Sequence, residues 1–214
     1  MGGLVLGLDC GLTVTKAVVF DEEGGVRSSA SARVAQDSPR PRWVERDVDE
    51  MWKASAGAIR SALEEGGIDP QDILGVGVTA HGDGLYLLDE EGRPTRPGIL
   101  SLDSRAHRIT KRWEAEGRSD RILEVTGQVA EPLSPAPLLA WMVENEPEVV
   151  ERTRWALVCK DVVKLYLTGE VAADPTKAST SFCDVRTQTY SEEALAVIAA
   201  GLPGTSCAPG SGCT

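Results

Sequence analysis

Two strand-like runs separated by a short turn open the sequence and limit what the chain can fold into. The runs are residues 4–9 (LVLGLD) and 14–20 (VTKAVVF), both rich in aliphatic and β-branched residues. The turn between them contains Gly11, and a glycine allows a tight reversal of the chain. The pattern predicts an antiparallel β-hairpin, and residues 26–35 can add a third strand after the turn at 21–25.

The hydrophobic period then changes from two residues to between three and four. Apolar side chains between residues 47 and 65 recur as they do on one face of an amphipathic helix. Asp47 followed by Glu50 has the spacing of a capping box, and Gly66–Gly67 can end the helix. We therefore expect a hairpin with a third strand, followed by one long helix.

Strand-like and helix-like segments alternate along the rest of the chain. Further strands are predicted at 73–80, 84–88, 99–102 and 155–158, and further helices at 104–117, 137–144 and 161–168. The run at 73–80 (ILGVGVTA) has the pattern of a buried strand. This order of elements favours an α/β fold with a mixed sheet that is flanked by helices and has the hairpin at one edge.

The composition excludes several classes of function. The 214 residues carry 22 Lys and Arg against 33 Asp and Glu, which is a formal net charge of −11 and argues against a nucleic-acid or anionic-membrane partner. No run approaches the roughly 18 apolar residues of a membrane span, and the N-terminus lacks the pattern of a secretory signal. The five cysteines have neither disulfide-framework nor zinc-site spacing. We therefore expect a cytoplasmic protein that binds neither nucleic acid nor membrane.

The string DCGLTVTK, which begins at Asp9, carries the clearest chemistry. Asp9 at the end of a strand can hold hydrated Mg²⁺, a cation that takes few protein carboxylates and keeps many waters. Gly11 permits a turn whose backbone N–H groups face a phosphate. Thr13 and Thr15 add hydroxyl donors, and Lys16 adds positive charge. A plain hairpin turn with a solvated lysine is the alternative, but the position between two strands favours phosphate binding.

These residues resemble the first phosphate motif of the superfamily that contains sugar kinases, Hsp70 and actin. Later segments are similar to the FGGY carbohydrate kinases, a family that includes glycerol kinase and xylulokinase. In chain order the segments are 41–47 (PRWVERD) with Trp52, 81–89 (HGDGLYLLD), 99–105 (ILSLDSR), 160–170 (KDVVKLYLTGE) and 173–174 (AD). The HGDGLY string looks more like kinases of L-xylulose, related keto-sugars or polyols than like glycerol kinase.

The resemblance implies a ribonuclease H-like (actin-like ATPase) fold, with residues 1–200 as the N-terminal, sugar-binding domain. Family members are much longer, with a second, ATP-binding domain that we expect to be absent from this chain and a catalytic aspartate in a G-x-x-D-N motif. No such string occurs here, so we expect the catalytic base beyond residue 214 and almost no turnover by this chain alone. Residues 201–214 (GLPGTSCAPGSGCT) have no charge and no periodicity, which predicts an irregular tail at a truncated end.

The resemblance also assigns roles to individual residues. The aspartate that matches Asp9 helps to hold the metal at the ATP phosphates. His81, Gly82 and Asp83 match the sugar pocket, where a neutral imidazole can donate to or accept from a sugar hydroxyl. The Asp103 carboxylate can accept from paired hydroxyls, although a helix N-cap is an alternative for it, as a packed side chain is for His81. Because each follows a short apolar run, we expect His81 and Asp103 to face one cleft.

The expected function is a phosphotransferase with an alcohol acceptor: ATP-dependent phosphorylation of a ketopentose such as xylulose, or of a polyol, with Mg²⁺. One alternative is a non-catalytic sugar- or nucleotide-binding module of the same fold. Another is an actin- or Hsp70-like protein, against which the WVERD and HGDG segments count. The expected partners are the sugar or polyol and a second copy of the chain in a homodimer. Unaided turnover by this chain would place the base among Asp161, Asp174 and Asp184.

Overall fold

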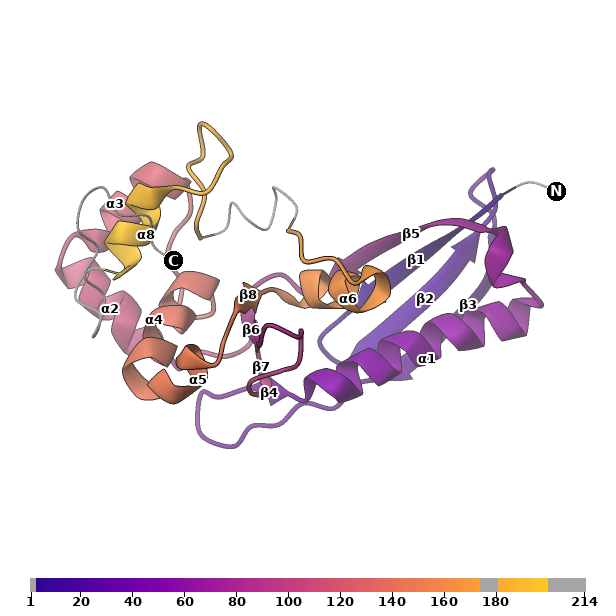
Figure 1. The fold of residues 1–214 in the computed structure, drawn as a ribbon, viewed down its shortest axis with the longest axis horizontal. Coiled ribbons are helices and arrows are strands. Elements are labelled where there is room, and N and C mark those ends of the chain that lie inside the picture. Colours follow the sequence, from indigo (N-terminus) through magenta and orange to yellow (C-terminus); the bar gives the residue numbers. More distant parts are fainter. Residues whose placement is uncertain (1–2, 174–180, 200–214) are drawn as a thin grey trace.

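A computed structural model describes residues 3–173 and 181–199 of the chain, which form two four-stranded sheets with helices around them (Figure 1). The first sheet contains β1 (Leu4–Cys10), β2 (Val14–Phe20), β3 (Val26–Arg33) and β5 (Ile73–Ala80), and the second contains β4 (Glu45–Arg46), β6 (Gly84–Leu88), β7 (Gly98–Leu100) and β8 (Trp155–Leu157). The helices are α1 (Val48–Gly66), the 3₁₀ turn η1 (Pro70–Asp72), α2 (His107–Ala115), α3 (Arg118–Thr126), α4 (Pro135–Asn145), α5 (Pro147–Glu151), α6 (Cys159–Thr168) and α8 (Glu192–Ala199). None of the helices in these two ranges is long and apolar enough to span a bilayer.

The first sheet has the strand order β3-β2-β1-β5 and confirms the predicted hairpin and mixed sheet. Strands β1 and β2 pair antiparallel, with Asp9 opposite Lys16, whereas β1 and β5 pair parallel, with Asp9 beside Thr79. The carboxyl ends of β1 and β5 therefore meet at one edge, where ligands bind in open α/β sheets.

Helix α1 covers one face of this sheet, as Figure 1 shows. The Asp47 side chain caps its N-terminus by accepting from the Glu50 backbone N–H, and Gly67 ends it in the left-handed conformation. Its buried residues recur with the helical period and pack against the sheet: Val48, Met51, Ser55, Ala58 and Ala62. The helix predicted over 47–65 is confirmed.

The face of the first sheet opposite α1 is open, and a separate prediction, about strand β5 at the edge of the sheet, was wrong. Strand β5 was expected to be buried, but it is an edge strand with Leu74 74% exposed and Val76 47% exposed. On the neighbouring strand Val5 is 45% exposed. An apolar run predicts burial only if both of its faces are covered, and within the described residues β5 pairs with β1 alone.

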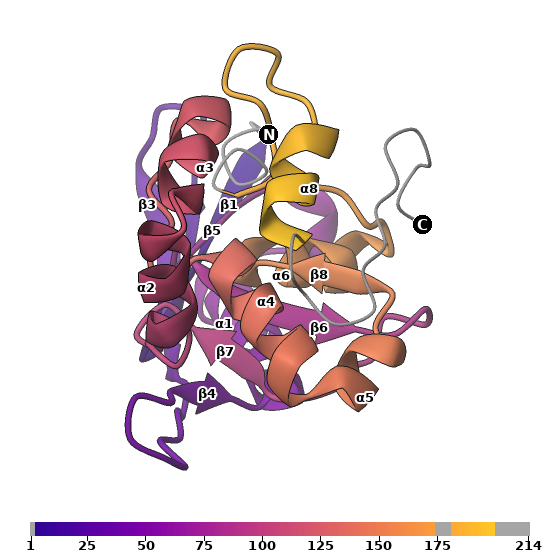
Figure 2. The same cartoon turned by 90° about the vertical axis from the view of Figure 1, so that its left-hand side faces the viewer.

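Strand β6 joins the first sheet's core to a second one. Tyr86 and Leu88 pack in the core under the first sheet, whereas Leu85 and Leu87 point into the core formed with α2, α3, α4 and α8. This alternation is the period of a strand that is buried on both faces. Figure 2 shows these four helices in front of the second sheet. Helices α3, α5 and α8 were not predicted, and residues 201–214 lie outside the described ranges.

Candidate functional site

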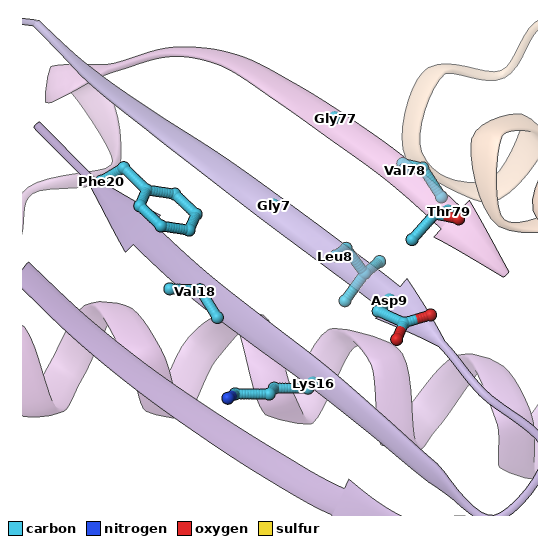
Figure 3. A pocket seen from close by; sticks show the side chains of 9 residues that line it. All are labelled: Gly7, Leu8, Asp9, Lys16, Val18, Phe20, Gly77, Val78 and Thr79. Atoms are coloured by element: carbon cyan, nitrogen blue, oxygen red, sulfur yellow. The ribbon is translucent and has the colours of Figure 1, made fainter. Parts of the chain in front are cut away.

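Asp9, Lys16 and Thr79 lie on the open face of the first sheet, away from α1. Asp9 is the penultimate residue of β1, and both it and Lys16 are exposed. Figure 3 shows Asp9 and Thr79 side by side near the strand ends, with the Lys16 amine directed away from Asp9. No ion pair joins Asp9 and Lys16 in the described part of the chain, so both charges remain available to a ligand.

An open depression of about 370 Å³ runs from these charges along the same face (Figure 3). Its floor is hollow because Gly7 and Gly77 have no side chains at neighbouring positions of β1 and β5. Val18 and Phe20 form its apolar wall. One end of this face is therefore charged and the rest is apolar.

The turn at residues 11–13 presents two backbone donors in succession. The Gly11 N–H donates to the Val14 carbonyl at 3.1 Å, whereas the N–H groups of Leu12 and Thr13 have no acceptor among the described residues. An added Cβ on Gly11 would lie 2.8 Å from the Val14 carbonyl oxygen, so the turn requires glycine there. Successive N–H groups without acceptors can receive an anion, and the phosphate role predicted for this turn stays a prediction.

Thr15 does not belong to this group, contrary to its predicted place at the phosphate. It is fully buried on the α1 side of β2, whereas the neighbouring Lys16 points to the open face. Successive residues of a strand face opposite sides of the sheet, so Thr15 and Lys16 cannot both reach one ligand from β2.

His81 lies directly after β5, at the same edge as the turn. Its backbone N–H donates to the Cys10 carbonyl at 3.1 Å, and its Nε2 is 3.0 Å from the hydroxyl of the buried Tyr86. The prediction that His81 follows a strand end is confirmed. The residue as a whole is half buried, and its Nδ1 is itself buried.

Gly82 and Asp83 form the half-buried connection that leads from His81 into β6. The next residue, Gly84, has φ of 103°, and its N–H donates to the Leu133 carbonyl at 3.1 Å. An added Cβ would lie 2.4 Å from the Ile99 carbonyl oxygen. Glycine is therefore required at position 84 by the close approach of β6 to β7, whatever the role of the HGDG segment toward a sugar.

Asp103 does not face a cleft, so the expectation that it shares one with His81 was wrong. Its side chain is fully buried and accepts from the Val44 N–H at 2.7 Å and from the Arg105 guanidinium at 2.7 and 3.0 Å. Arg105 also donates to Glu45 at 2.7 Å and lies 3.9 Å above the Trp43 ring. Asp103 thus neutralises a buried cation and holds the WVE segment against the loop after β7.

Two buried cysteines lie beneath the site. Burial raises the pKa of the Cys159 thiol to about 12, and burial also raises the pKa of Cys10 above its usual value. Both thiols therefore stay protonated at neutral pH, as expected of small buried residues rather than nucleophiles. Cys10 Sγ lies 3.3 Å from the Ser55 hydroxyl, which ties β1 to α1.

The residues at this edge fit a hydrated Mg²⁺ and a phosphate chain. Asp9 offers one exposed carboxylate, which matches the preference of Mg²⁺ for few protein ligands and many waters. The described residues contain no cluster of three or more His, Cys, Asp and Glu that could hold a metal by themselves. Lys16 and the two free N–H groups offer positive charge and donors for phosphate oxygens.

Sequence reasoning missed Arg46 and Tyr86. Arg46 is 1% exposed and contacts the turn at residues 11–13, and Tyr86 contacts His81. Tyr86 could have been found from its position in the HGDGLY string, inside an apolar run. Nothing local marks Arg46 as buried, because it stands in the polar string WVERD.

Comparison with known proteins matches the description "FGGY family of carbohydrate kinases, N-terminal domain" to residues 4–203. A probable L-xylulose kinase of Pasteurella multocida is 38% identical over 82% of this chain and 36% of its own length, and the xylulose kinase of Escherichia coli is 30% identical over 90% and 39%. A crystal structure of a "xyloylose kinase" from Brucella ovis superposes with a TM-score of 0.84 at 32% identity, over 91% of this chain and 40% of that one.

These likenesses confirm the predicted actin-like, ribonuclease H-like fold. The chain spans less than half the length of these relatives, and it corresponds to their N-terminal part. This chain belongs to the FGGY family of carbohydrate kinases, and it carries the family's N-terminal domain.

Proposed function

We propose that this chain serves ATP-dependent phosphorylation of a sugar or polyol hydroxyl, with a ketopentose such as xylulose as the substrate class. The observation that carries the proposal is that Asp9 and the free N–H groups of Leu12 and Thr13 lie at the edge where His81 lies, with Lys16 opposite Asp9 on the neighbouring strand. Asp9 and the turn can bind a divalent cation and phosphates, and His81 can contact a hydroxyl-bearing ligand beside them.

The residues of this chain would act mainly by positioning and by charge. Mg²⁺, when bound at Asp9, would supply charge neutralisation at the nucleotide phosphates. Lys16 and the N–H groups of the turn would hold phosphate oxygens, which favours the transfer because negative charge spreads over these oxygens. Phosphoryl transfer also needs a base for the acceptor hydroxyl, and none of these residues is assigned that role.

His81 is the residue we propose for contact with the sugar. The Tyr86 hydroxyl holds its Nε2 at 3.0 Å and so restricts the ring orientation. The relatives named L-xylulose kinase and xylulose kinase support a ketopentose as the substrate. Relatives named glycerol kinase are the reason that a polyol is tested as well. Gly82 and Asp83, which follow His81 in the same connection, would line this part of the site.

Two titrations of the purified chain test the proposal. Isothermal titration calorimetry with L-xylulose, D-xylulose and glycerol measures the affinity of the sugar site. A second titration with inorganic pyrophosphate in the presence of Mg²⁺ measures the affinity of the phosphate site. We expect His81→Ala to weaken ketopentose binding about tenfold, which is about 1.4 kcal/mol, and to leave pyrophosphate binding unchanged. His107→Ala, at the chain's other histidine, should change neither. Equal losses on both ligands in His81→Ala would contradict a sugar-site role.

A non-catalytic binding module is the second candidate, because the described residues provide binding groups and no assigned base. A coupled ADP-release assay separates the two functions. The kinase assignment requires ketopentose-dependent ADP release when residues 4–203 replace the matching domain of an L-xylulose kinase relative. A folded chimera that binds the sugar and releases no ADP would favour the module.

A further inference from the structure

Arg46 joins the WVERD segment to the turn at residues 11–13. Its guanidinium donates to the Gly11 carbonyl from both terminal nitrogens at 3.3 Å, and one of these nitrogens also donates to the Leu12 carbonyl. The side chain is 1% exposed. One buried cation thus binds two consecutive carbonyls of the turn that carries the free N–H groups.

Binding these carbonyls also orients the N–H groups of the same peptide units. The peptide bonds here are trans, and in a planar trans peptide the C=O of one residue and the N–H of the next point in opposite directions. With the carbonyls of Gly11 and Leu12 directed at Arg46, the N–H groups of Leu12 and Thr13 point away from it. These are the two donors without an acceptor among the described residues.

Arg46 forms no ion pair with a carboxylate of the described residues. The adjacent Glu45 pairs with Arg96 and Arg105 instead, and the Nε of Arg46 has no partner in the described part of the chain. A buried guanidinium normally has a carboxylate partner, because desolvating a lone charge is costly. Placed behind the turn, this positive charge adds to the attraction of the N–H groups for an anion.

We propose that Arg46 is a positioning residue: it holds the turn at residues 11–13 open so that the N–H groups of Leu12 and Thr13 meet a nucleotide phosphate. This inference rests on the proposed function, since it takes the turn to be a phosphate site. Arg46 acts through the backbone, because its own guanidinium lies behind the turn and is buried. A planar fork is required for this task, because it reaches two carbonyls at once.

The test uses the 214-residue chain labelled with ¹⁵N, with Arg46→Gln, Arg46→Lys and the control Arg105→Lys. Arg105 is also buried, but it binds Glu45 and Asp103 and does not contact the turn. Backbone order parameters of Leu12 and Thr13 are measured without ligand, and then Mg²⁺ with inorganic pyrophosphate is titrated. We expect order parameters near the rigid value of about 0.85 in wild type and below about 0.6 in Arg46→Gln.

We expect pyrophosphate affinity to fall at least tenfold in Arg46→Gln and by less in Arg46→Lys. A folded Arg46→Gln with a rigid turn and wild-type affinity would overturn the inference. So would an equal loss of order at the turn in Arg105→Lys. Should Arg46→Gln not fold, Arg46→Lys decides, because a lysine that keeps the turn rigid and the affinity unchanged shows that the fork is not needed. A wild-type chain without pyrophosphate shifts at Leu12 and Thr13 would instead refute the phosphate site itself.

Discussion

Replacing Asp103 with asparagine should destabilise the protein far more than it changes any ligand contact. The carboxylate lies at 0% exposure against Arg105, also at 0%, and accepts from the Val44 N–H at 2.7 Å. Asparagine keeps the shape but removes the charge, and it presents an NH₂ group to one of these donors. Among the described residues, Arg105 would then keep Glu45 as its only carboxylate partner in the buried cluster.

Breaking one partner of a buried ion pair costs about 3–5 kcal/mol, which is a large part of the roughly 5–15 kcal/mol that keeps a domain folded. With a urea m-value of about 2 kcal/mol/M, the unfolding midpoint should fall by about 2 M. Tryptophan fluorescence reports the transition, because Trp43 and Trp141 lie 3.9 and 5.2 Å from the Arg105 guanidinium.

Asp89→Asn is the matched control, because Asp89 pairs with Arg93 in an exposed hairpin turn. Such pairs are worth about 1 kcal/mol or less. A loss of less than 1 kcal/mol in Asp103→Asn, as small as in the control, would refute the argument that Asp103 stabilises a buried cation. Unchanged stability with weaker sugar binding would instead restore Asp103 as a sugar contact.

Three further substitutions test the backbone and the buried thiol. Arg42→Gly should raise the free energy of unfolding by up to about 1 kcal/mol, because Arg42 is exposed and has φ of 74°; urea melts that show a loss would contradict this. Gly84→Ala should cost about 2 kcal/mol or more through its clash with the Ile99 carbonyl, whereas Gly57→Ala in α1, where an added Cβ meets nothing within 4 Å, should stabilise by about 0.5–1 kcal/mol; equal signs in thermal unfolding would refute this. Because burial raises the Cys159 pKa from 9.0 to about 12, the unfolded chain loses this proton first, so the free energy of unfolding should fall by about 1 kcal/mol per pH unit above pH 9. Cys159→Ala should reduce that slope in urea titrations between about pH 8 and 11, and an unchanged slope would show that the thiol does not contribute.

Short-range patterns in the sequence determined the elements that carry the site. The hairpin and α1 follow from hydrophobic period, turn glycines and an Asp47 cap, all of which act within a few residues. The same period of two also separates Thr15 from Lys16. Placing both at one phosphate therefore contradicted information that the sequence already contained.

Only the tertiary structure decided which charges are buried and what they hold. Asp103 meets the Val44 N–H across 59 positions, and Arg46 meets the Gly11 carbonyl across 35. Whether a charged side chain enters the core depends on partners that folding brings together, because burial without them costs several kcal/mol. The same holds for β5, because the neighbours that would cover an apolar strand come from elsewhere in the chain. The turn that we propose as a phosphate site could thus be found in the sequence, whereas the buried cation behind it became visible only in the fold.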